Sequence, residues 1–207
     1  MTSSRIVGGL LVLGALVFWA GAATPPYRQW MGVSTEEYLT IVGSHGLNWR
    51  AMHLLFAVGT MLTGAGLAGL TGLLRASGDR IWATIGLTLF SVAAVLWLVQ
   101  VGFRVTLTPW ASLELARNSQ VPSIYPALNQ WTGILFAAFM ILGYLAHAAY
   151  GKAVLGTTAL PRWAGWSALV FGIVAVPGLA TVVFQPPLML FVVPFTLGIA
   201  VLRAPSL

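Results

Sequence analysis

The chain has 207 residues, of which 58% are hydrophobic and only 7% are charged. A soluble domain carries roughly 25% charged residues, so this composition excludes a globular fold with a water-exposed surface. The net charge of +6 comes from basic residues scattered singly between apolar runs, which indicates membrane topology and lipid contact rather than nucleic-acid binding. The chain contains no cysteine, which excludes disulfides, thiolate metal sites and Fe–S clusters.

Several apolar runs approach the roughly 20 residues that cross a hydrocarbon core about 30 Å thick. Backbone groups in that core must be hydrogen-bonded internally, and the runs are continuous rather than alternating, which favours helices over a barrel. We therefore predict an all-α, polytopic transmembrane bundle that forms a single membrane domain over residues 1–207. The predicted spans cover residues 6–23, 49–74, 81–103, 127–150, 163–184 and 187–202.

The first span has a second interpretation as a signal peptide. Arg5 precedes its apolar core, and Ala20-Gly21-Ala22 matches a small-residue cleavage site. The apolar core is longer than the roughly 7–15 residues usual in signal peptides, so a retained helix is the favoured interpretation.

Two short surface helices are predicted on the outer side. Ser34 and Glu37 form a capping box, and the residues after them give the helix one apolar face. Farther along, Thr108 followed by Pro109 is typical of an N-cap with proline at the first helical position. This pair predicts a second surface helix at about Pro109–Arg117.

The basic residues also predict an orientation. With six spans, both ends of the chain lie on one side of the membrane. That side carries Arg5, Arg75, Arg80, Lys152, Arg162 and Arg203, and the other side carries Arg28, Arg50, Arg104 and Arg117. The excess of positive residues predicts that both termini are cytoplasmic, and we expect a bacterial inner membrane.

Small residues in the second span predict close helix packing. Ala65 with Gly69, and Ala68 with Gly72, are spaced four residues apart, which lets two helix backbones approach closely. A central packing helix is the favoured interpretation. A face for a homo-oligomer or a partner membrane protein, formed by Ala65, Gly69 and Gly72, is the alternative.

Polar and aromatic residues gather at the outer edge of the predicted bundle. Trp97, Gln100 and Arg104 lie at i, i+3 and i+7, so one face of the third span carries all three. Polar groups at this depth are costly unless they are paired or hydrated. The candidate ligand-binding residues are Arg50, His53, Trp97, Gln100, Arg104, Glu114, Asn129 and Trp131. The alternative is a ring of interfacial anchors, with Arg50 and Arg104 reaching toward lipid headgroups.

Other chemistries have weaker support. His53 and His147 fall near opposite ends of their spans, so we predict no shared haem, and no other cofactor or metal is predicted. No carboxylate lies inside a predicted span, which argues against proton- or cation-coupled transport. The residues Gly64–Gly69 match G-x-G-x-x-G in letters, but they lie inside a predicted membrane helix, and no other enzyme motif occurs.

The segments Ser4–Leu10 and Leu160–Trp166 resemble those of uncharacterised bacterial multi-pass membrane proteins of six helices and about this size. That resemblance implies a layout and no activity. We expect a non-enzymatic membrane component that binds a lipidic or amphipathic ligand, or a partner membrane protein, through an outward-facing polar and aromatic vestibule. The alternatives are a small transporter of neutral or anionic solutes and a membrane-embedded enzyme acting on a lipid or isoprenoid.

Overall fold

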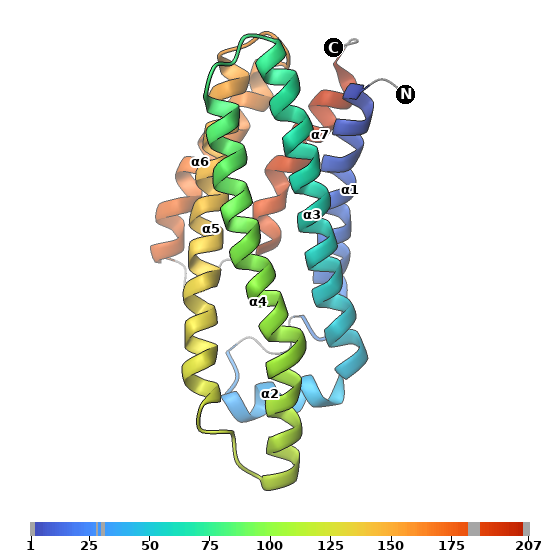
Figure 1. The fold of residues 1–207 in the computed structure, drawn as a ribbon, viewed down its shortest axis with the longest axis vertical. Coiled ribbons are helices and arrows are strands. Elements are labelled where there is room, and N and C mark those ends of the chain that lie inside the picture. Colours follow the sequence, from blue (N-terminus) through green and yellow to red (C-terminus); the bar gives the residue numbers. More distant parts are fainter. Residues whose placement is uncertain (1–2, 28, 30–31, 182–186, 205–207) are drawn as a thin grey trace.

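The structure is a computed structural model that describes residues 3–27, 29, 32–181 and 187–204, and it is an all-helical bundle (Figure 1). Five of its helices are long and apolar enough to cross a membrane, which confirms the predicted fold class. These helices are α1 (Ser3–Ala23), α3 (Gly46–Ala76), α4 (Trp82–Asn118), α5 (Tyr125–Leu155) and α6 (Arg162–Thr181). The remaining elements are α2 (Thr35–Ser44), the 3-10 helix η1 (Pro187–Phe191) and α7 (Val192–Arg203).

The sixth predicted span is shorter than the others. It consists of η1 and α7, which together form the short apolar stretch Pro187–Arg203. Residues 182–184 of the predicted fifth span lie outside the described residues.

The two ends of the described chain lie together. Ser3 of α1 and Arg203 of α7 are at one end of the bundle, and the α3–α4 and α5–α6 connections lie at that end as well (Figure 1). We call this the termini end. The short helix α2 crosses the opposite end, which we call the α2 end (Figure 1).

Exposed tryptophans lie at two levels along the bundle. Trp82, Trp163 and Trp166 are exposed near the termini end, while Trp110 and Trp131 are exposed toward the α2 end. At 1.5 Å per residue, α5 rises about 36 Å between Trp131 and its last residue. A bilayer with its headgroup regions is about 40–45 Å thick, and tryptophans concentrate at both of its interfaces. The two levels therefore mark an integral membrane protein.

Two residues within the α3–α4 turn, Gly78 and Asp79, stabilise its conformation. Gly78 adopts φ +102°, a left-handed conformation that residues with a side chain rarely take. Asp79 follows, and its carboxylate oxygen Oδ2 accepts a hydrogen bond of 2.9 Å from the backbone N–H of Ala83 in the first turn of α4. Such a bond satisfies one of the donors that a helix start leaves without a partner.

Helix α1 packs between α3 and α7 and leaves its remaining face exposed, with Leu13 and Leu16 about half exposed. Its side chains Leu11, Ala15 and Phe18 are fully buried. The ring of Phe18 stacks on Phe191 of η1 at 3.8 Å between centroids and lies 4.6 Å from the ring of Phe56 in α3. Helix α1 is thus a central packing element of this fold.

One predicted boundary was wrong. The segment 109–117 is not a separate surface helix, because α4 runs without a break from Trp82 to Asn118 and contains Pro109. A proline inside a helix removes one backbone hydrogen bond, and packing against α2 supports the helix here. Ser112 donates its hydroxyl to the backbone carbonyl of Leu39 in α2 at 2.7 Å.

The first predicted surface helix is present as α2. Ser34 is its N-cap, and the Ser34 hydroxyl accepts a hydrogen bond from the backbone N–H of Glu37 at 3.2 Å. Tyr38, Leu39 and Val42 form its buried face, as expected for an amphipathic helix.

Candidate functional site: an aromatic cavity at the α2 end

A cavity of about 130 Å³ lies toward the α2 end, between α2, α3, α4 and α5. Helix α6 and the η1–α7 segment end part-way along the bundle (Figure 1), and Pro187 at the start of η1 lies at the edge of the cavity. Aromatic side chains make a large part of its wall. They are Tyr27, Tyr38, Trp49, Phe56, Trp97 and Phe136.

Arg104 of α4 supplies the positive charge of the cavity. Its Nη1 donates to the Tyr38 hydroxyl at 2.9 Å and to Asn129 Oδ1 at 2.8 Å, and its Nη2 donates to the Thr132 hydroxyl at 3.4 Å. The indole Nε1 of Trp49 donates to the backbone carbonyl of Arg104 at 2.6 Å. Helices α2 and α5 therefore hold the half-buried guanidinium in place, and α3 bonds the backbone of the same residue.

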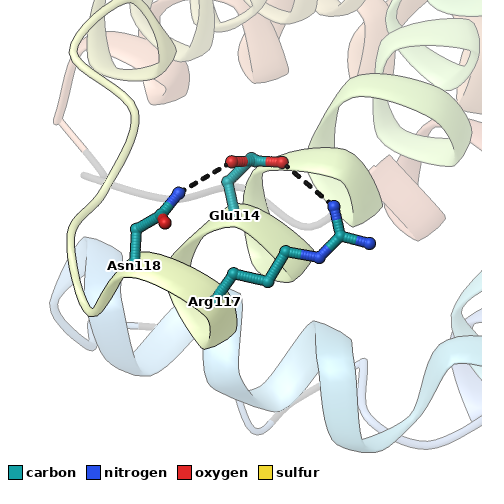
Figure 2. Close-up of polar contacts among 3 residues, drawn as sticks. All are labelled: Glu114, Arg117 and Asn118. Atoms are coloured by element: carbon teal, nitrogen blue, oxygen red, sulfur yellow. Dashed lines mark hydrogen bonds and ion pairs between the residues drawn. The ribbon is translucent and has the colours of Figure 1, made fainter.

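The three side chains that accept from Arg104 are all uncharged. Within the described residues, the acidic side chain that forms an ion pair is Glu114, and its partner is Arg117 at 3.5 Å. Figure 2 shows that Glu114 also accepts a 2.9 Å hydrogen bond from Asn118, and all three side chains lie on the last turns of α4. The charge of Arg104 is thus balanced by no carboxylate that the structure describes.

Two lining side chains carry buried polar atoms that have no hydrogen-bond partner among the residues that the structure describes. These atoms are Gln100 Oε1, an acceptor, and Trp97 Nε1, a donor. A buried polar group without a partner costs about 1–3 kcal/mol. Such atoms are therefore uncommon in native interiors unless a ligand, an ion or water completes them.

His53 adds a further acceptor. Its Nδ1 lies 2.8 Å from the backbone carbonyl of Trp49, and a nitrogen that bonds a carbonyl must carry the proton. In a neutral imidazole the other nitrogen, Nε2, is then an acceptor. The cavity wall thus offers donors from Trp97 and Arg104, and acceptors from Gln100 and His53.

Tyr38 remains a neutral phenol in this setting. It lies in α2, outside the membrane-spanning helices, and burial raises the pKa of its hydroxyl well above the ordinary value of 10.0, against the opposing effect of the nearby Arg104 charge. The Tyr38 hydroxyl can therefore accept from Arg104 without carrying a compensating negative charge.

The structure brings together some of the sequence-predicted residues. His53, Trp97, Gln100 and Arg104 all line the cavity, and Asn129 lies behind them as a partner of Arg104.

The other three predicted residues lie outside the cavity. Arg50 is exposed and lines a separate surface depression of about 280 Å³ beside Pro109 and Leu113. Trp131 is 47% exposed and points away from the packed core, and Glu114 is at the far tip of α4 (Figure 2). For Glu114 the physical reason is the continuity of α4, which carries residue 114 roughly 15 Å beyond Arg104 at 1.5 Å per residue.

Sequence reasoning missed most of the wall that α2 and α5 contribute. On α5, the lining residues Gly133 and Phe136 lie four and seven residues after the predicted Asn129, so they share its helix face. That spacing was available as a signal. The contribution of Tyr38 was not, because it depends on how α2 folds over the bundle.

The second buried histidine, His147, is far from this site. His147 of α5 is fully buried, and neither of its ring nitrogens has a hydrogen-bond partner in the described part of the chain. It lies about 12 Å from the end of α5, whereas His53 lies about 35 Å from the end of α3, with both ends at the termini end. Within the described residues, no group of three or more metal-ligating side chains comes together.

The fold and the exposed tryptophan levels define this chain as a polytopic helical membrane protein with an aromatic, hydrogen-bonding cavity at the α2 end. Comparison with protein-family models, curated proteins and solved structures gave no match.

Proposed function

We propose that the cavity binds the head of an amphipathic molecule, and that the protein is a membrane component that holds such a ligand without transforming it. The observation that carries the proposal is the combination of aromatic walls with a guanidinium that has only uncharged partners. Arg104 gives the cavity a positive charge, and its bonds to Tyr38 and Asn129 hold that charge in one place.

The size of the cavity supports a small head. An engineered cavity of about 150 Å³ in another protein accommodates benzene. A volume of about 130 Å³ therefore suits one ring or a few heavy atoms, and any longer part of the molecule must lie outside. Pockets that enclose a drug-sized ligand are larger, at roughly 300–1,000 Å³.

The polar atoms favour a head that both donates and accepts hydrogen bonds. A phenol or quinol hydroxyl can donate to Gln100 Oε1 or His53 Nε2, and its oxygen can accept from Trp97 Nε1 or Arg104. Its ring matches the aromatic walls. The charge of Arg104 disfavours cations and favours neutral or anionic heads.

We also propose that both termini face the cytoplasm, which places the cavity at the outer face of the membrane. The support is the set of six basic residues near the termini end. Because the chain has no cysteine, single cysteines at Ser77 and Ser119 report the two ends separately. An impermeant maleimide added to intact cells should label Ser119→Cys and not Ser77→Cys, and the reverse pattern would overturn the orientation.

Binding can be tested with para-decylphenol, using the purified protein in nanodiscs and empty nanodiscs as the background. Decylbenzene has the same tail without the hydroxyl and serves as the matched probe. We expect saturable binding of para-decylphenol and no saturable binding of decylbenzene. Replacing Arg104 by Met removes a charged donor worth about 1.5–3 kcal/mol, which corresponds to a loss of roughly 10- to 150-fold in affinity.

Two variants separate binding from folding. Gln100→Leu removes a buried polar atom that has no partner, so it should weaken phenol binding while leaving stability equal or higher. Arg50→Met alters an exposed arginine outside the cavity and should change neither para-decylphenol binding nor stability. The proposal fails if the phenol shows no saturable binding, if decylbenzene binds equally well, or if Arg50→Met costs as much as Arg104→Met.

A further inference from the structure

We propose that the ligand enters the cavity sideways from the bilayer, through an opening at Gly133, and that its apolar tail stays in the lipid beside α5. This inference rests on the proposed function, since it assigns a route and a tail position to the same ligand. It also makes the class more specific, because the ligand must be a tailed lipid-like molecule rather than a water-soluble one.

The water-facing side of the cavity is covered. Helix α2 crosses that end of the bundle (Figure 1), and Tyr38 from α2 and Tyr27 from the segment after α1 both line the cavity and are buried. The bond between the Ser112 hydroxyl and the Leu39 carbonyl ties α2 to α4. Entry from the aqueous side would require α2 to lift away from its buried contacts.

The side wall is different at Gly133 of α5. This residue lines the cavity and is also exposed, so the cavity reaches the outside of the bundle there. A Cβ atom built on Gly133 would meet no atom within 4 Å. Glycine inside a helix is about 1 kcal/mol less favourable than alanine, and here it leaves a gap where any side chain would stand.

The gap faces lipid rather than water. Ala137 and Ile141 lie four and eight residues after Gly133, on the same helix face, and both are exposed apolar residues. By helix rise, Gly133 lies about 33 Å from the termini end of α5. The hydrocarbon core is about 30 Å thick, so Gly133 sits where hydrocarbon meets headgroups. A head near Arg104 and a tail along Ala137 and Ile141 then each lie in their preferred medium.

The test compares a tailed and an untailed probe, para-decylphenol and phenol, on two variants of one residue. Gly133→Ala adds a methyl group in open space and should bind both probes as the unchanged protein does. Gly133→Phe fills the gap and should lose para-decylphenol by at least about tenfold, equivalent to 1.4 kcal/mol, while phenol binding persists. Circular dichroism and gel filtration verify that both variants fold.

The outcomes distinguish the two proposals. If the unchanged protein binds neither probe, the proposed function fails. If Gly133→Phe binds para-decylphenol as the unchanged protein does, the lateral route is wrong while the binding cavity stands.

A second measurement locates the tail directly. Ile141 of α5 and Met61 of α3 lie at similar depth. Ile141→Cys and Met61→Cys each give the chain a single cysteine, to which a fluorophore can be attached. A para-decylphenol brominated at the tail end should quench the label at position 141 saturably and leave that at position 61 unaffected. Equal quenching at both positions would overturn the proposed tail position.

Discussion

A close helix contact in the bundle gives a stability prediction of defined size. Helices α1 and α3 meet at Gly59, where an added Cβ atom would lie 2.7 Å from the backbone nitrogen of Phe18 and 2.8 Å from the backbone oxygen of Gly14. Both of these atoms belong to the backbone, so neither can rotate out of the way. Gly59→Ala is therefore expected to force the two helices apart.

The size of the effect follows from the distances. Ordinary contact with a Cβ atom begins at 3.4 Å, so the contact to Phe18 is about 0.7 Å too short. Overpacking of this kind costs about 1–3 kcal/mol. Alanine is favoured over glycine in a helix by about 1 kcal/mol, which offsets part of that cost. The net loss in unfolding free energy should be about 0–2 kcal/mol.

A matched variant isolates the packing effect. Gly72 lies on the same helix, and a Cβ there would meet nothing within 4 Å. Gly72→Ala should therefore raise the unfolding free energy by the helix preference of alanine over glycine, with no packing cost. Reversible unfolding in mixed micelles with SDS should place Gly59→Ala about 1–3 kcal/mol below Gly72→Ala. Equal stability of the two variants would refute the close approach of α1 and α3. Because Phe18 contacts Phe56 in the cavity wall, Gly59→Ala should also weaken ligand binding.

Three further predictions concern two hydrogen bonds and the pKa of Tyr38. Trp49→Phe removes the indole donor to the Arg104 carbonyl and should lower the unfolding free energy by about 1–3 kcal/mol in the same assay. An unchanged unfolding free energy would contradict this hydrogen bond. Tyr150→Phe removes the bond of 2.8 Å between the Tyr150 and Thr71 hydroxyls, and a double-mutant cycle with Thr71→Val should give a coupling of about 0.6 kcal/mol, the average for bonds between membrane helices. The pKa of Tyr38 is raised in the folded protein, so its contribution to stability is complete below pH 10.0 and should fall as pH rises above that value. Tyr38→Phe should lessen that alkaline loss in unfolding measurements across pH, and an identical pH profile would contradict it.

The layout of the fold could be predicted because lipid imposes strong rules on sequence. Continuous apolar runs indicate spans, and an even number of spans brings the two ends together, as Ser3 and Arg203 are found. The sixth span was expected to be short, and α7 with η1 is short. These features depend on residue type along the chain and require no knowledge of tertiary contacts.

The wrong boundary at Pro109 shows that local sequence patterns do not always decide where a helix begins. The pair Thr108 and Pro109 suits a helix start, yet the same letters fit inside a helix when neighbours support it. Thr108 is buried and accepts from the Tyr125 hydroxyl at 3.3 Å, and Ala111 is fully buried as well. These contacts come from α2 and α5, so only the tertiary structure decides between the two interpretations.

The polar face of α4 was predictable, whereas its surroundings were not. Trp97, Gln100 and Arg104 share a face by helical periodicity alone. Whether that face meets a cavity depends on where α6 and η1 end and on how α2 folds across the bundle. The small-residue pattern of α3 was also ambiguous, and the structure shows Gly69 against Val7 of α1 while Ala65 and Gly72 are exposed.

The contact between α1 and α7 has a consequence for how the protein is made. Gly8 lies against Leu202 and Gly198 lies against Leu11, and the Trp19 indole donates to the Leu188 carbonyl of the adjoining η1 at 2.9 Å. About 170 residues separate these two helices, and ribosomes add roughly 5–20 residues per second, so α1 waits roughly 10–30 s for its partner. During synthesis the α7-facing surface of α1 therefore stays uncovered until α7 has been made.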